Sequence, residues 1–535
     1  MPVRTSPELP EAAAMAPERH PLRGAPEWLA LSLYGVVVAA AIHFHEPWAD
    51  EAQAWQIARS LSLRQMFQVL RYEGSPGLWH LLLWCLSRLH VSYAGMRWTS
   101  GAIALAGVAI LLLCSPFPRW LKLLLPFTFF LLFQYAVVAR SYVLAPMLLF
   151  LLATLWTRRF EKPIAVAVTL GLLANVALHL AMFSGGFAVV YGIELWWRHR
   201  RSGQLPVARR LGMAIFLLLG FYAVAVLTAR PPKDVAFPQG QSPLPAAQAR
   251  SSEQVARLRH GHSLQAIRYQ FAQRLTPPLA TGLVLPLGLA LLFWATLCWA
   301  LFKENKLRYL IPGLLFVLFC HFVAARPWHS GLMTPYVIAL LWMVWPNQGR
   351  NFKTLPRHEQ CVLGFFLLIA LIQVYWAAYA LNVDRTQAYS PGARTAAFLK
   401  PYVDRGATIV ETGNDFDSVA VEPYFDHKVF ANEPYAFHWW STRNRAQENY
   451  SILVRAGVRD RPALVLVQWL ADGDTQPSPE AIDLIPGVPE LRTLGYRNTH
   501  VFCGKMPVEG AIILESHCEL VFEPSHNADV EGHGS

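Results

Sequence analysis

The stretch Leu279–Phe302 reads LATGLVLPLGLALLFWATLCWALF and contains no charged residue. The runs Trp98–Pro118 and Leu123–Ala139 are also free of charge. Each is close to the roughly 20 residues that a helix needs to cross the ~30 Å hydrocarbon core of a bilayer. A single run of this kind is compatible with a buried helix of a soluble protein. Their repetition along the chain indicates a protein that crosses a membrane many times.

The composition agrees with this interpretation. Of the 535 residues, 54% are hydrophobic and only 15% are charged, whereas about a quarter of the residues of a soluble protein are charged. Residues 1–27 are rich in Pro, Glu, Arg and Ala and contain no apolar stretch that resembles a cleavable signal. We therefore expect 1–27 to be a disordered cytoplasmic tail, followed by an uncleaved first span from Trp28 to Phe44.

The formal net charge of +11 does not indicate a nucleic-acid partner, because the basic residues lie in short loops between apolar runs. Such clusters mark the cytoplasmic ends of spans by the positive-inside rule. The four clusters are Arg158, Arg159 and Lys162; Arg198, Arg200, Arg201, Arg209 and Arg210; Lys303, Lys306 and Arg308; and Arg350, Lys353 and Arg357.

From these clusters we expect a polytopic α-helical membrane protein with roughly 11–13 transmembrane helices in the cell (inner) membrane. The candidate spans are 28–45, 76–90, 98–115, 120–138, 141–157, 163–179, 182–197, 211–229, 279–301, 308–325, 331–346 and 360–381. An inside N-terminus and an outside C-terminal domain require an odd number of crossings. We expect 76–90, which is short, to lie at the membrane surface, and this places Arg140 on the outer side.

The chain is thus expected to comprise a membrane domain over 28–381, with outer loops 46–75 and 230–278, and an extracytoplasmic α/β domain over 382–535. Within this tail, short β-rich runs (Ala407–Val410, Ala463–Gln468, His500–Cys503 and Ala511–Leu514) alternate with a helical candidate at Arg443–Val458. Two of the seven cysteines, Cys503 and Cys518, lie in it. They form either a disulfide, as in an oxidising compartment, or two free thiols.

Unusual polar residues gather in the first outer loop. Asp50 and Glu51 follow the first span within His43–Trp55 (HFHEPWADEAQAW), and Glu73 lies in Arg71–His80 (RYEGSPGLWH), which closes the same loop. A carboxylate beside the membrane is costly unless it is paired or in use, and one here could take the proton of an attacking hydroxyl or amine. The alternative is structural: Asp50 would be an N-cap, and Glu51 would be favoured by the helix dipole. Leu63–Leu70 has an apolar stripe at helical spacing.

These two motifs resemble the first outer loop of GT-C fold glycosyltransferases, in particular the bacterial RgtA/B/C/D-like and protein O-mannosyltransferase-like proteins (glycosyltransferase family 39). That pattern has Asp-Glu beyond the first span and Gly-His-Pro-x-Leu-Trp before the next. Here Ser75 stands where the histidine is usual. The runs Ala139–Tyr142 (ARSY) and Ala325–Gly331 (ARPWHSG) resemble two later outer-loop motifs, so the resemblance covers roughly residues 28–381.

The resemblance implies inverting transfer of a sugar from a polyprenyl-phosphate-linked donor at the outer face of the membrane. It makes Asp50 the general base, with Glu51 and Glu73 supporting it or binding the acceptor, which is a lipid, a polysaccharide or a protein. Arginine suits a departing phosphate because its guanidinium can bind two oxygens. The candidates for this role are Arg140, Arg326 and His329. Without the resemblance, Arg140 could equally be an interfacial arginine, and Arg326 and His329 ordinary loop residues.

Three further features leave alternatives open. The stretch Gln248–Leu275, with Arg257 and Arg259, is either a basic amphipathic lid over an anionic lipid carrier or a loop that meets membrane lipids. The aromatic run Tyr435–Trp440 (YAFHWW) could contact carbohydrate or pack in a core. No metal is firmly implied, although Asp50, Glu51 and Glu73 with His43, His45 and His80 could assemble a divalent site.

Two rival functions compete with sugar transfer. A secondary transporter would place charged residues near the membrane midplane and show two related halves, neither of which is evident here. A non-catalytic scaffold of envelope polysaccharide assembly would need none of the acidic residues for chemistry.

Overall fold

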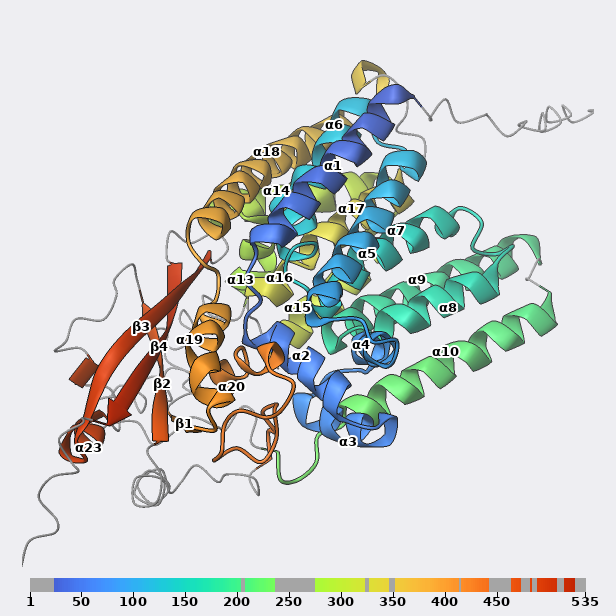
Figure 1. The fold of residues 1–535 in the computed structure, drawn as a ribbon. Coiled ribbons are helices and arrows are strands. Elements are labelled where there is room, and N and C mark those ends of the chain that lie inside the picture. The colour runs from blue at the N-terminus through green and yellow to red at the C-terminus, as the bar shows by residue number, and fades with distance from the viewer. Residues whose placement is uncertain are drawn as a thin grey trace, which may run out of the picture.

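The computed structural model describes residues 24–203, 207–235, 275–322, 327–345, 352–412, 415–441, 463–472, 482–483, 488–507 and 514–524. They form a bundle of helices with a small sheet domain beside one of its ends (Figure 1). We call this end of the bundle, where the sheet domain lies, the domain end. The opposite end is called the basic end.

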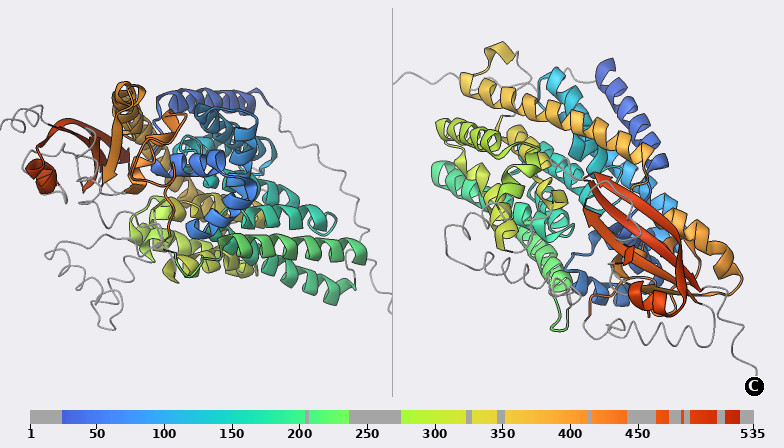
Figure 2. Two further views of the ribbon diagram at one scale, coloured as in Figure 1. Left: turned by 60° about the horizontal axis from the view of Figure 1, so that its bottom comes forward. Right: turned by 90° about the vertical axis from the view of Figure 1, so that its left-hand side faces the viewer.

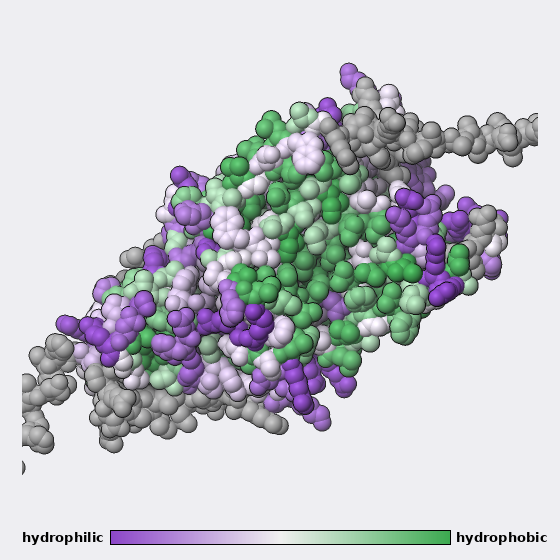
Figure 3. Space-filling view, turned by 45° about the vertical axis from the view of Figure 1, so that its right-hand side comes forward, coloured by the Kyte–Doolittle hydropathy of each residue, from purple (hydrophilic) through white to green (hydrophobic). Residues whose placement is uncertain are grey.

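Among the described residues, five helices are long and apolar enough to cross a membrane: α1 (Ala25–Phe44), α5 (Tyr93–Cys114), α9 (Leu178–Ser202), α10 (Ala208–Ala229) and α18 (Arg357–Thr386). Hydrophobic residues gather in a broad band across the bundle, with hydrophilic residues towards its ends (Figure 3). Apolar side chains such as Phe216 and Leu219 on α10 are largely exposed within it. A surface of this kind is suited to lipid rather than water.

The remaining predicted spans are shorter helices or broken segments. The short helices are α4 (Leu78–Arg88), α7 (Leu144–Trp156), α8 (Pro163–Ala174), α15 (Ile311–Phe322) and α17 (Met333–Val344), with η3 (Ser141–Val143), η5 (Leu307–Leu310) and η6 (Phe352–Thr354) beside them. The segment 76–90 contains α4, whose 11 residues are fewer than a regular span needs.

Two predicted spans are wrong as single helices. The segment 279–301 consists of α13 (Thr276–Leu279), η4 (Thr281–Leu283) and α14 (Leu287–Lys303), with a 90° bend between η4 and α14. Val284 adopts φ 57°, and Pro286 lacks the N–H that would continue the helix.

The segment 120–138 is divided into α6 (Arg119–Leu124), η1 (Leu125–Phe127) and the π-helical turn η2 (Phe130–Gln134). The residues from Phe129 to Ala139 are all buried. Irregular backbone at membrane depth is tolerated where it is enclosed by protein, which explains how this segment can depart from a helix.

Described residues of the first and third basic clusters meet at the basic end, and the start of α18 lies beside them. Glu194 on α9 pairs with Arg159 of the first cluster and Arg308 of the third, each at 2.8 Å. Glu304 joins the third cluster to the start of α18, because it contacts Lys306 and His358, each at 2.7 Å. These two clusters therefore belong to one end of the bundle, as their expected common sidedness requires.

In the part of the sheet domain that the structure describes, four strands lie in the order β1-β2-β4-β3: β1 (Thr408–Thr412), β2 (Ala463–Asp472), β3 (Tyr496–Pro507) and β4 (Leu514–Pro524). β1 pairs with β2 in parallel and the other pairs are antiparallel. Alternate residues of β2 pack in two separate cores. Leu464 and Leu466 pack with helix α19 (Gly392–Asp404) in one core. Val465 and Val467 pack with helix α23 (Val488–Thr493) in the other. Figure 2 shows the sheet to one side of the bundle.

The prediction of an α/β tail is met in its main features. Three predicted strands overlap β1, β2 and β3, and the fourth run, Ala511–Leu514, lies outside the described residues except for Leu514, the first residue given for β4. Cys503 and Cys518 face each other across β3 and β4 and form a disulfide. The helix expected at Arg443–Val458 lies outside the described residues.

A close approach between α9 and α15 gives the first test. A Cβ on Gly186 would lie 2.3 Å from the Pro312 Cα, whereas Gly192, farther along α9, has nothing within 4 Å. We expect Gly186→Ala to lower the free energy of unfolding by about 1–3 kcal/mol, because helix backbones must separate. Gly192→Ala should be neutral or stabilising. Thermal unfolding in detergent would measure both, and equal melting temperatures for the two variants would contradict this packing.

Candidate functional site

The link from α1 to α2 (Ala49–Ser60) forms the core of the candidate site. Glu51, the third residue of α2, is completely buried, and its Oε2 accepts a hydrogen bond from the N–H of Trp48 at 3.2 Å. Its Oε1 accepts one from the N–H of Ala139 at 2.7 Å. A glutamate at this position that reaches back to the N-cap stabilises the start of a helix. Glu51 therefore joins α2 to the irregular segment before η3.

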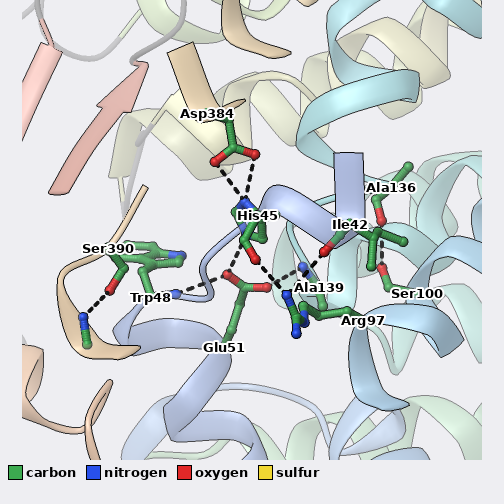
Figure 4. Close-up of polar contacts among 11 residues, drawn as sticks. Ile42, His45, Trp48, Glu51, Arg97, Ser100, Ala136, Ala139, Asp384 and Ser390 are labelled. Atoms are coloured by element: carbon green, nitrogen blue, oxygen red, sulfur yellow. Dashed lines mark hydrogen bonds and ion pairs between the residues drawn. The ribbon is translucent and has the colours of Figure 1, made fainter. Parts of the chain in front are cut away.

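His45 lies between two carboxylates (Figure 4). Its Nε2 is 3.2 Å from Glu51 Oε2, and its Nδ1 is 3.1 Å from Asp384 Oδ2, near the end of α18. Burial lowers the pKa of His45, but the charges of Asp384 and Glu51 outweigh burial and raise it to about 10. His45 is thus a cation that neutralises part of the charge of two buried acids.

Asp50, one residue before Glu51, points elsewhere. Its Oδ2 forms an ion pair with an Arg140 Nη at 2.6 Å, and the two side chains are 21% and 15% exposed. The Arg140 guanidinium also lies over the rings of Trp48, Tyr142 and Trp328, at 5.7, 5.2 and 5.1 Å from their centroids. The aromatic rings hold the guanidinium while leaving both partners of the ion pair in reach of solvent.

A second imidazole, on His329, adjoins this cluster. Helix α16 (Pro327–Ser330) carries Trp328 and His329, and the His329 ring packs edge-on against Tyr142 at 5.7 Å. It also stacks on His179, in the first turn of α9, at 4.0 Å. His179 could not be identified from the sequence, because an isolated histidine at the start of an apolar run gives no local signal. Arg326, Arg257 and Arg259 lie outside the described residues.

Glu73 returns to the start of α2 as the loop motif suggested. It ends α3 (Leu63–Glu73), the helix expected from the apolar stripe at Leu63–Leu70. The Gln53 side-chain amide donates to Glu73 Oε1 at 2.8 Å, and Gln53 lies one helical turn after Asp50. Burial raises the pKa of Glu73 to about 7, and the negative charge of Asp50 contributes to this shift. Asp50 and Glu73 therefore belong to one electrostatic site.

The structure brings four of the predicted site residues together. Asp50, Glu73, Arg140 and His329 gather at the domain end, so the expectation that Arg140 lies on the same side as Asp50 is confirmed. Trp48, not Asp50, is the N-cap of α2. Glu51 has no exposed surface in this conformation, which excludes direct contact with a ligand and leaves it a positioning role. Arg97 donates to the carbonyls of Ile42 and His45 and holds the same turn.

The divalent site considered from the sequence is not assembled in the part of the chain that the structure describes. There, the group of potential ligands close enough to share an ion is Glu304, His358 and Glu359. This group is far from the candidate site, because His358 and the site residue Asp384 lie near opposite ends of α18, about 40 Å apart along the helix axis. Glu304 already accepts hydrogen bonds from Trp345 and Lys306.

The chain matches no family model, no curated protein and no solved structure in the comparisons made.

The charged cluster at His45 predicts a pH dependence of stability. A pKa raised from 6.5 to about 10 on folding contributes stability that is complete below pH 6.5 and is lost as the pH rises through 10. We expect His45→Gln to remove this part of the decline, and Asp384→Asn to weaken it. The measurement is the melting temperature of each protein between pH 6 and 10.5.

His43→Gln is the matched control, because His43 is exposed at the end of the same helix. It should retain the dependence of the wild type. An unchanged pH profile in both His45→Gln and Asp384→Asn would show that His45 is not held as a cation.

Proposed function

We propose that this protein is a membrane glycosyltransferase of the GT-C type, which moves a sugar from a polyprenyl-phosphate-linked donor to an acceptor hydroxyl or amine. The observation that carries the proposal is the Asp50–Arg140 ion pair, which is partly exposed and surrounded by aromatic rings, together with the partly buried carboxyl of Glu73. It supplies a base and a phosphate-binding cation at one place. The resemblance of the loop motifs to GT-C enzymes supports the same class.

The ion pair suggests how the donor activates the site. A phosphate that approaches Arg140 competes with Asp50 for the guanidinium, because phosphate also binds arginine through two oxygens. When Arg140 turns to the phosphate, the Asp50 carboxylate loses its partner and is available to accept a proton. The general base would thus be released by binding of the donor.

In the reaction the acceptor oxygen or nitrogen attacks C1 of the donor sugar from the side opposite the phosphate, and Asp50 takes its proton. The bond between C1 and the phosphate oxygen breaks, and its electron pair leaves with the polyprenyl phosphate. Arg140 and His329 would stabilise the charge that grows on this leaving group. Glu73, with a pKa of about 7, would bind the acceptor or share its proton.

The apolar surface of the bundle suits a lipid-linked donor, and no soluble cofactor is needed for this chemistry. By the positive-inside rule the basic end faces the cytoplasm. The domain end, with Asp50 and Arg140, would then face the outer side of the cell membrane, and the sheet domain would be extracytoplasmic.

Asp50→Asn tests the proposed base. The full chain in lipid nanodiscs would be incubated with synthetic polyprenyl-phosphate-linked hexoses, and release of polyprenyl phosphate would be measured. We expect release to fall roughly 10²–10⁴-fold, because the amide cannot accept the proton. Glu161→Gln, in the exposed Arg158–Glu161 pair, is the control and should retain activity. Unaltered turnover in Asp50→Asn would leave only a carrier or a scaffold.

Arg140→Lys tests the phosphate site. Lysine keeps the charge but loses the planar fork and the contacts with three rings. The expected result is a rise of about tenfold in the KM for the donor with little change in thermal stability. Arg158→Lys, at the exposed pair, should leave the KM unchanged. A normal donor KM in Arg140→Lys would rule out phosphate binding by this side chain.

A further inference from the structure

The aromatic run Tyr435–Trp440 joins the sheet domain to the candidate site. Phe437 is buried among Ile57 of α2 and the α3 residues Met66 and Leu70, and Tyr435 and Trp439 pack against the same cluster. The Trp439 ring also lies 5.6 Å from Tyr72. Every second residue of the run therefore anchors it to the first loop.

The intervening residues lie in a different group. The His438 and Trp440 rings are 4.2 Å apart, and Trp440 lies 5.4 Å from Phe416 on α20 (Asp415–Ser418). All three side chains are partly exposed. We call Phe416, His438 and Trp440 the aromatic platform. Figure 1 shows α20 close to α2, with which it is in contact.

The backbone of the platform is held directly beside the acids. Gln53 donates from its amide to the carbonyl of His438 at 2.6 Å and accepts from the N–H of His438 at 2.8 Å. The same amide donates to Glu73.

The end of the run is fixed as well. Ser441 Oγ donates to Asp234 Oδ2 at 3.1 Å, and Tyr72 donates to the same carboxylate at 3.2 Å. The platform is thus tied to α2, α3 and the segment after α10. A surface fixed in advance loses little entropy when it binds a ligand.

We infer that the aromatic platform is the acceptor subsite and that it binds a pyranose ring of a carbohydrate acceptor. The C–H faces of a sugar pack on the electron-rich faces of Trp and Phe, while the imidazole of His438 can hydrogen-bond hydroxyls. Glu73 and Asp50 lie where a hydroxyl of that ring would be activated. This inference rests on the proposed function, since it names the acceptor of the same reaction.

Binding is tested separately from transfer. The full-length protein in nanodiscs would be applied to an array of defined oligosaccharides. We expect the wild type to capture a set of these glycans. The amount captured should fall roughly tenfold in Trp440→Ala and in Phe416→Ala, and should be retained in Trp440→Phe. Trp299→Ala, which removes a 45% exposed tryptophan of α14, is the control and should bind as the wild type does.

Asp50→Asn separates this inference from the proposed function, because it should still capture the glycans while transfer is lost. Capture of no glycan by the wild type overturns the inference, as does equal capture by Trp440→Ala. Transfer to a peptide or lipid acceptor with an unchanged KM in Trp440→Ala also overturns it and leaves the transferase in place. If all of the variants kept their transfer activity, Asp50→Asn included, the proposed function would be overturned instead.

Discussion

The arrangement depends on a buried histidine that holds two carboxylates. His45 contacts Glu51 at the start of α2 and Asp384 near the end of α18, and all three side chains are almost fully buried. Two like charges at this depth would repel each other and would be costly to desolvate without a cation between them. The cluster fixes where α1 ends, where α2 begins and where α18 passes into the sheet domain.

This constraint explains why two adjacent acids behave differently. Consecutive residues of a helix project about 100° apart, so a helix that buries one of them turns the next away. Glu51 is turned inward to His45, Trp48 and Ala139. Asp50 is thereby directed towards Arg140 and the aromatic rings around it. Glu51 is therefore buried in the structure, whereas Asp50 stays partly exposed at the candidate site.

The sheet domain also contacts the link between α1 and α2. It follows Asp384 in the chain and returns to the first loop through Phe437, which is buried between α2 and α3. The Glu46 carboxylate accepts a hydrogen bond from the N–H of Ala393 at 2.6 Å, at the start of α19. The domain therefore contacts the link between α1 and α2 on both sides.

The amino-acid sequence by itself determined the features that depend on local composition. Long uncharged runs indicate helices suited to a bilayer, basic clusters indicate one common end, and the loop motifs bring Asp50 and Glu73 into one loop. The breaks after Val284 and within 120–138 and the contacts of His179 and Gln53 were not evident from the sequence. Only the tertiary structure decided the partners of each charge, since His45 and Asp384 are separated by 339 positions. Hydrophobic partition acts on each segment separately, whereas the pairing of buried charges depends on which segments pack together.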